Sequence, residues 1–323
     1  MELRGVKQPG IQQTSKKKVS AEKYSAAKKI KRHWQLYLLA IVPLAFLITF
    51  KYVPMAGIVI AFKDYSVTKG IMGSDWVGLR YFSYFFESPN FSLLMKNTLG
   101  LSLYGLIIGF LCPIILALAL NEVGNARFKK LIQTVTYAPF FISTVIMVSI
   151  IILFLSPNAG LVNNILELFG IGQINFMGIP AYFKSIYVWS DVWQNTGYAA
   201  IIYLAALAGI DPTLYEAAKI DGASRLQKIT YVDLPGITPI IVVLLVLSIG
   251  NIMSLGFEKI YLMQNDLNTS SSEVIATYVY KIGLLGANYS FAAAVGLFNS
   301  AVNFILIITA NTISKRFSSS SLW

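Results

Sequence analysis

Six long apolar runs dominate the pattern of hydrophobic and polar positions. The stretches without Asp, Glu, Lys or Arg are 33–50, 97–121, 131–166, 192–210, 234–257 and 282–314. A helix needs roughly 20 residues to cross a bilayer, and each stretch is that long or nearly so. The next longest uncharged stretch, 168–183, is interrupted by Gly170, Gly172 and Pro180, which leave backbone polar groups that lipid cannot satisfy. The pattern therefore predicts six transmembrane helices and not seven.

The flanking polar residues narrow these runs to expected spans and connections. The spans are expected at about 34–52, 98–120, 131–155, 186–208, 237–257 and 292–313. A short interfacial helix is expected near 161–169, and an ordered, aromatic-rich surface at 53–96. The fold class is accordingly all-α, a polytopic integral membrane protein with one six-helix domain over 33–317, a basic tail at 1–32 and a short C-terminal tail at 318–323.

Composition and charge support this interpretation and give it an orientation. Hydrophobic residues make up 56% of the 323 residues, charged residues 13%, and the mean hydropathy is +0.64, which does not describe a soluble surface. With the N-terminus inside, 18 of the 26 Lys and Arg fall on cytoplasmic segments, as the positive-inside rule requires. We therefore expect both termini in the cytoplasm. The net charge of +11 follows from this topology and does not indicate nucleic acid as a partner.

A charged segment at 211–235 interrupts the apolar pattern between the fourth and fifth spans. Asp211 can cap a helix whose first position is Pro212, and Gly222 can end it in the left-handed conformation. The ten residues from Pro212 to Asp221 would form a rod about 15 Å long outside the membrane. A second part, 224–232, leads to Leu234-Pro235, which is expected to turn the chain back into the membrane. A membrane protein with such a loop needs a soluble partner.

The residues of this loop carry a resemblance. Glu216-Ala217-Ala218, three residues, Gly222, nine residues and then Val232-Asp233-Leu234-Pro235 resemble the coupling loop of permease subunits in binding-protein-dependent ABC importers of the maltose-transporter type. Val232 departs mildly from the usual Ile. The stretches 61–65, 203–207 and 220–223 look most like the subgroup that imports oligosaccharides and polysaccharide fragments, including alginate and rhamnogalacturonan.

The resemblance implies a coupling role and a set of partners. The residues that would couple the loop to an ATPase are Glu216, Ala217, Ala218, Asp221, Gly222, Ala223, Leu234 and Pro235. The chain has no Gly-Lys dipeptide and hence no P-loop, so it is expected to be no enzyme and to bind no cofactor, with ATP and Mg on the partner. The expected assembly contains a second homologous permease as a heterodimer, two ATPase subunits and an extracytoplasmic solute-binding protein in a bacterial plasma membrane.

Polar residues inside the apolar runs mark a possible path for a sugar. Such residues are costly in lipid and usually face water or the protein interior. In the fourth expected span they are Asp191, Gln194, Asn195 and Tyr198, with the ring of Trp193 close by, and in the last two spans they are Asn251, Ser254, Asn299 and Asn303. Hydrogen bonding between helices is an equally good explanation for each of them.

Two further sites are disfavoured, and one other class of function stays open. Cys112 is the sole cysteine and His33 the sole histidine, so a metal site built on these residue types is not expected. The alternative to an ATP-driven importer is an ion-coupled carrier or channel independent of ATPase subunits. A carrier should show a charged relay or paired broken helices, and only Asp191 approaches the first. The identity of the sugar does not follow from these residues.

Overall fold

The computed structural model describes residues 32–317 and divides the chain into two compact units, Met1–Gly57 and Ile58–Trp323. Of the expected basic tail, only Arg32 belongs to the described residues, and the expected C-terminal tail at 318–323 lies outside them.

Unit 1 contains the first expected span. Helix α2 (Trp34–Leu47) continues through the π-type turns of η1 (Ile48–Tyr52) into α3 (Val53–Met55). The helical run from Trp34 to Phe62 is long and apolar enough to cross a membrane. From Trp34 to Val59 its large hydrophobic side chains are exposed, as expected for a helix whose solvent is lipid.

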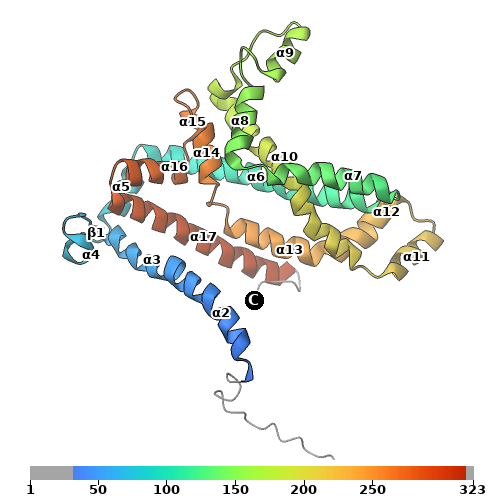
Figure 1. Cartoon of the computed structure of the whole chain (residues 1–323), viewed down its shortest axis with the longest axis horizontal. Coiled ribbons are helices and arrows are strands. Elements are labelled where there is room, and N and C mark those ends of the chain that lie inside the picture. Colours follow the sequence, from blue (N-terminus) through green and yellow to red (C-terminus); the bar gives the residue numbers. More distant parts are fainter. Residues whose placement is uncertain (1–31, 318–323) are drawn as a thin grey trace, which may run out of the picture. The chain divides into compact units, whose positions relative to one another are not determined.

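Unit 2 is built almost entirely of helices (Figure 1). The 3-10 helix η2 (Ala56–Phe62) enters it, and its one sheet in the described residues is the antiparallel pair β1 (Lys63–Asp64) and β2 (Asp75–Trp76). This ribbon is a small departure from the expected all-α class. The remaining elements are α4 (Gly70–Gly73), α5 (Arg80–Glu87), α6 (Asn90–Asn121), α7 (Ala126–Tyr137), η3 (Ala138–Phe141), α8 (Thr144–Phe154), α9 (Leu161–Leu168), η4 (Phe176–Gly178), α10 (Pro180–Ala208), α11 (Pro212–Ile220), α12 (Arg225–Lys228), η5 (Ile229–Asp233), α13 (Leu234–Gly250), α14 (Phe257–Met263), α15 (Thr269–Ser272), α16 (Ile275–Val279), η6 (Tyr280–Leu285) and α17 (Tyr289–Phe317).

The long helices account for four candidate membrane spans, or up to six if each of two bent pairs is one span. The expected third span at 131–155 is one of the bent pairs, because α7 with η3 and α8 meet at 102°. The bend has a local cause. The backbone is extended at Ile142 and Ser143, and Ser143 starts a new helix by accepting a hydrogen bond from the Ile146 amide. A helix, α9, is present where the sequence predicts a short helix at 161–169; its place at the membrane interface stays a prediction.

The fifth run differs from its prediction at both ends. Leu234-Pro235 does not turn the chain, because α12, η5 and α13 form one helix from Arg225 to Gly250. Pro235 has no amide to donate, and the helix widens into the π-type turns of Ile229–Asp233 just before it. The helix then stops at Gly250 instead of 257, so Asn251 and Ser254 lie in the turn that follows it.

Three hydrophobic clusters pack unit 2, and small residues let its helices approach closely. One cluster joins α6, α10 and α13 through residues such as Ala117, Ala200 and Ile237. A Cβ atom on Gly197 of α10 would lie 2.1 Å from the Thr136 carbonyl oxygen of α7. Only glycine therefore fits at this crossing, which is how membrane helices commonly pack.

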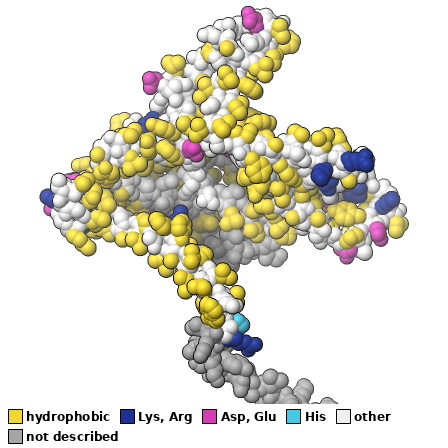
Figure 2. Space-filling model, in the orientation of Figure 1, with side chains coloured by type: hydrophobic (Ala, Val, Ile, Leu, Met, Phe, Trp, Pro, Cys, Tyr) yellow, Lys and Arg dark blue, Asp and Glu magenta, His cyan; other side chains and the backbone are white. Residues whose placement is uncertain are grey.

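The surface separates a hydrophobic body from one charged end. Figure 2 shows hydrophobic side chains over much of the visible face and dark blue basic side chains gathered at the end that carries α7 and α12. Arg127, Lys129 and Lys130 belong to α7, and Arg225 and Lys228 to α12. The charged loop thus lies at one end of a lipid-compatible body.

Candidate functional site

The first part of the charged loop folds into α11, a short capped helix. The Asp211 carboxylate accepts a hydrogen bond from the Thr213 amide at 2.9 Å, and Pro212 occupies the first turn. This bond to the amide holds the pKa of Asp211 below its usual value, because the charged form is the better acceptor. The cap predicted from Asp211-Pro212 is confirmed.

Gly222 ends α11 in the way the sequence predicts. Its φ is +71°, in the region that side chains other than glycine rarely adopt. The Ala223 amide donates to the Ala218 carbonyl at 2.9 Å and the Gly222 amide to the Lys219 carbonyl at 3.2 Å. These two bonds are the Schellman pattern. The spacing from Ala218 to Gly222 is therefore what lets the helix stop and reverse at this point.

The residues assigned to coupling present an accessible face. Glu216, Ala217, Asp221, Gly222 and Pro235 are exposed, and Ala218, Ala223 and Leu234 are half-buried. Helix α11 buries none of its residues. Large hydrophobic side chains of the loop are also exposed, among them Leu214 and Ile220 of α11 and Leu226 of α12. This surface is available for a partner that has both polar and apolar contacts to offer.

Polar contacts tie this loop to α6 and to the base of α13. The Tyr215 hydroxyl donates to the Asp233 carboxylate at 2.5 Å, and the Asn121 amide donates to the same oxygen at 3.3 Å. Burial, and after it the hydrogen bond to Asp233, raises the pKa of Tyr215 to about 12. The tyrosine therefore keeps its proton at neutral pH and acts as the donor.

A cavity of about 330 Å³ lies between α6, α10 and the turn after α13, within the size range of small-molecule sites. Asp191, Asn251 and Ser254, all predicted as path residues, line it together with Ser102 and Tyr187. The Ser102 hydroxyl is buried and has no hydrogen-bond partner among the described residues. The cavity thus combines several polar groups that an entering hydroxylated solute can bind.

Lys259 and Asp191 form an ion pair beside this cavity. The Lys259 ammonium lies 3.3 Å from the Asp191 carboxylate and 5.0 Å from the ring centre of Tyr187, with its side chain only 7% exposed. Asn195, also predicted for the path, donates to the same carboxylate at 3.0 Å. The sequence analysis missed Lys259 and Tyr187, because Lys259 follows Asp191 by 68 positions and such a separation gives no local signal.

Other predicted path residues tie elements together instead of lining this cavity. The Gln194 amide donates to the Ile142 carbonyl at 2.9 Å, and Tyr198 stacks on Phe140 with ring centres 3.8 Å apart. Both contacts join α10 to the bend between η3 and α8. Trp193 is exposed and lines a separate apolar pocket beside α8.

Asn299 and Asn303 of α17 hold the turn after α13. Asn303 accepts from the Met253 amide at 3.0 Å and donates to the Ser254 hydroxyl at 2.8 Å. Asn299 donates to the Met253 carbonyl at 3.3 Å. They position a wall of the cavity and do not line it.

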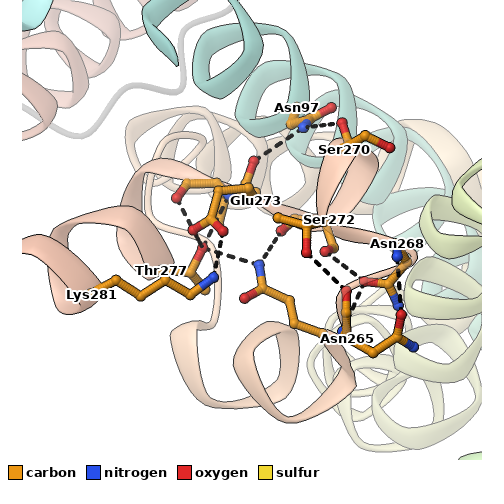
Figure 3. A network of polar contacts seen from close by, with 11 residues as sticks. Asn97, Asn265, Asn268, Ser270, Ser272, Glu273, Thr277 and Lys281 are labelled. Atoms are coloured by element: carbon orange, nitrogen blue, oxygen red, sulfur yellow. Dashed lines mark hydrogen bonds and ion pairs between the residues drawn. The ribbon is translucent and has the colours of Figure 1, made fainter. Parts of the chain in front are cut away.

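A buried polar network, absent from the sequence analysis, fixes residues 264–281 to α6 and to neighbouring segments (Figure 3). Asn97 of α6 donates to the carbonyls of Ser270 and Glu273 at 2.9 and 3.1 Å. Asn268 donates to the carbonyls of Met177 and Met263 and accepts from the Ser272 hydroxyl. Lys281 pairs with Glu273 at 2.5 Å. This Asn- and Ser-rich segment therefore forms an ordered support.

Comparisons with known proteins agree with this arrangement. Residues 109–319 match the model of the family described as the binding-protein-dependent transport system inner membrane component. The chain belongs to this family. It is thus a multi-pass membrane permease of the ABC transporter class, and not an enzyme.

Relatives from Bacillus subtilis and solved structures extend the match over most of the chain. The polygalacturonan/rhamnogalacturonan transport system permease protein YteP is 46% identical over 288 residues, covering 89% of this chain and 90% of YteP. Protein LplB is 45% identical over 294 residues, covering 91% and 92%. The permease resembles a chain of a bacterial ABC transporter involved in the import of the acidic polysaccharide alginate, with 41% identity, a TM-score of 0.83 and coverage of 90% and 98%.

A second solved structure is the bacterial alginate ABC transporter in complex with an alginate pentasaccharide-bound periplasmic protein. Its matching chain has 40% identity and a TM-score of 0.85, covering 92% of this permease and 99% of that chain. The family match favours the importer over the ion-coupled carrier or channel that the sequence analysis left open.

Proposed function

We propose that this permease carries an oligosaccharide or polysaccharide fragment through the bacterial plasma membrane, and that ATP hydrolysed on separate subunits drives it through α11. The observation that supports this most directly is the accessible, doubly capped α11, with Glu216 and Ala217 exposed on it. A short helix without buried residues gains little from its own chain, whereas a cleft on a partner can bury it.

The proposed assembly follows from the family. The chain pairs with a second, homologous permease, two ATPase subunits that bind ATP and Mg, and an extracytoplasmic solute-binding protein. The relative whose structure includes a pentasaccharide-bound periplasmic protein supports the last of these partners. Six spans with both termini in the cytoplasm fit this arrangement, with α7, η3 and α8 together as one span, α10 as another, and α11 bent away from α10 by 75° and outside the membrane.

The cavity between α6, α10 and the turn after α13 supports a sugar as cargo. Ser102, Asp191, Asn251 and Ser254 bring hydroxyl, carboxylate and amide groups to one cavity, with the Tyr187 ring beside them. Sugars offer many hydroxyl groups and apolar ring faces, which such a lining can bind. The names of the relatives favour a polysaccharide fragment containing uronic acids.

Co-purification tests the coupling role of α11. The permease is purified from its native membrane with and without the double change Glu216→Lys and Gly222→Asp, and bound proteins are identified by mass spectrometry. We expect a stoichiometric ATPase with the unaltered chain and its loss from the variant. A matched control carries the same two types of change at exposed positions distant from the loop, Glu167→Lys and Gly172→Asp, and should retain the ATPase. An ATPase that stays with the loop variant would disprove the role.

A further inference from the structure

Helix α11 is attached to the rest of unit 2 by very little. It buries no residue, and glycines stand near both of its ends, Gly209 before it and Gly222 after it. Among the described residues, one side-chain hydrogen bond leads from α11 to another element, from the Tyr215 hydroxyl to Asp233. A rod held in this way would swing freely without that bond, since few apolar contacts restrain it.

The receiving carboxylate is buried and oriented. Asp233 is fully buried at the end of η5, directly before α13. Its Oδ1 atom accepts from Tyr215 and from Asn121, the last residue of α6, while its Oδ2 atom has no partner among the described residues. One carboxylate oxygen thus joins three elements: α11, the base of α13 and the C-terminal end of α6.

A second contact connects two of the same elements. Glu122 is the residue directly after α6. Its carboxylate lies 3.0 Å from the ammonium group of Lys228 in α12, and the side chains of Lys228 and Glu122 are 25% and 13% exposed. It joins α12 to α6 but does not touch α11. Tyr215 is therefore the point at which α11 itself enters the connection.

We propose that Tyr215, Asp233 and Asn121 form a clasp that makes α11, the base of α13 and the C-terminal end of α6 move as one body. This role rests on the proposed docking of α11 to an ATPase. The clasp would transmit the displacement of the docked α11 to α6 and α13. Without the clasp, α11 rotates about the glycines near its two ends, and its displacement does not move α6. With it, displacement reaches α6, which lines the cavity with Ser102 and Gly105.

The chemistry of the clasp suits a connection that must keep one geometry. A buried carboxylate loses its hydration, and only well-placed hydrogen-bond donors offset that free-energy cost. A hydrogen bond to the carboxylate also weakens steeply as its angle changes. Apolar contacts in the same place would allow sliding between the helices. Tyr215 and Asn121 are positioning residues in this proposal, because neither is placed at the solute or at ATP.

The test uses the complete transporter, with its solute-binding protein, in proteoliposomes. Uptake and ATP hydrolysis are measured together for Tyr215→Phe and Asp233→Asn, after checking that the ATPase is still bound and that thermal stability is retained. We expect hydrolysis to continue and solute uptake per ATP to fall about tenfold, the factor typical of one charge-assisted hydrogen bond. Tyr231→Phe, an exposed tyrosine in η5, should leave the ratio unchanged.

The double variant and the failure cases separate the clasp from the docking. Tyr215→Phe combined with Asp233→Asn should lower uptake per ATP by less than the product of the two single effects, since both changes act on the bond between Tyr215 and Asp233. An unchanged ratio in Tyr215→Phe, or a loss of uptake that only follows a loss of stability, would overturn the clasp. Absence of bound ATPase from the unaltered transporter would instead overturn the proposed docking.

Discussion

The two ends of α6 are fastened in different ways. Near its N-terminal end, Asn97 and Thr98 bond to residues 270–275, a segment that Asn268, Glu273 and their partners hold with many buried hydrogen bonds (Figure 3). At its C-terminal end, Asn121 reaches the loop through the Asp233 carboxylate, and Glu122 reaches it through a close ion pair with Lys228 and a longer, exposed one with Arg225. One helix of 32 residues, about 48 Å long, joins both ends.

The difference separates support from transmission. A network with many partners tolerates the loss of one contact in function, although each loss costs stability. The connection of α11 depends on one hydrogen bond to Asp233, so removing the Tyr215 hydroxyl breaks it. We therefore expect substitutions in the polar network to change the free energy of unfolding, and substitutions in the loop to change uptake per ATP.

Gly222→Val should produce the largest effect. The φ of +71° is strained for a β-branched residue, so the reversal after α11 and the face offered to the ATPase are lost together. We expect solute uptake in proteoliposomes to fall by at least about thirtyfold, as expected for a strain of about 2 kcal/mol or more. Gly172→Val, at an exposed glycine with no positive φ, is the control. Equal solute uptake by Gly222→Val and Gly172→Val would contradict the role of the loop in coupling to the ATPase.

Asn268→Leu tests the other side of the comparison. The change removes donors to two backbone carbonyls and the acceptor for Ser272 while keeping the volume similar. We expect the free energy of unfolding to fall by about 2–4 kcal/mol, seen as a lower melting temperature in detergent. Uptake per ATP of the folded fraction should stay constant. A changed ratio with unchanged stability would show that the network also transmits movement.

Asp191→Asn should have an intermediate effect on solute uptake, and this effect should come from the cavity and from neither end of α6. The amide keeps the shape of the carboxylate but leaves the buried Lys259 ammonium without its counter-charge. We expect the solute concentration for half-maximal uptake to change about threefold to tenfold, with uptake per ATP unaltered. Glu258→Gln changes an exposed acid next to Lys259 and should have no effect. A response confined to uptake per ATP would place Asp191 in coupling instead of in the cavity.

Arg225→Ala should have the smallest effect of all. Its guanidinium lies 4.0 Å from Glu122 and its side chain is 81% exposed, so solvent screens the pair and Lys228 remains as the close partner. We expect uptake per ATP and melting temperature to match the unaltered transporter within error. A marked loss of coupling would mean that the second contact, and not Tyr215, is the main connection.

The sequence predicts the local features well because their causes are local. Asp211 and Gly222 cap α11 through bonds within three to five residues, and the apolar runs mark the long helices. The continuous helix through Leu234-Pro235 was not predicted, since the π-type turns that accommodate the proline leave no signal in residue type. Asp233 was also missed as a contact, because Tyr215 and Asn121 lie 18 and 112 residues away from it. The sequence predicts the cavity residues Asp191, Asn251 and Ser254 because each is a polar residue within an expected span.

A distance measurement between α11 and α6 tests the clasp most directly. Spin labels are placed at Lys219→Cys and Leu111→Cys, both exposed, in the assembled transporter after Cys112, the sole native cysteine, is replaced by serine. Pulsed electron paramagnetic resonance should give one narrow distance distribution with and without ATP, because the two helices move together. Tyr215→Phe should broaden it while Tyr231→Phe does not. A distribution that stays equally narrow in Tyr215→Phe would contradict the role of the clasp.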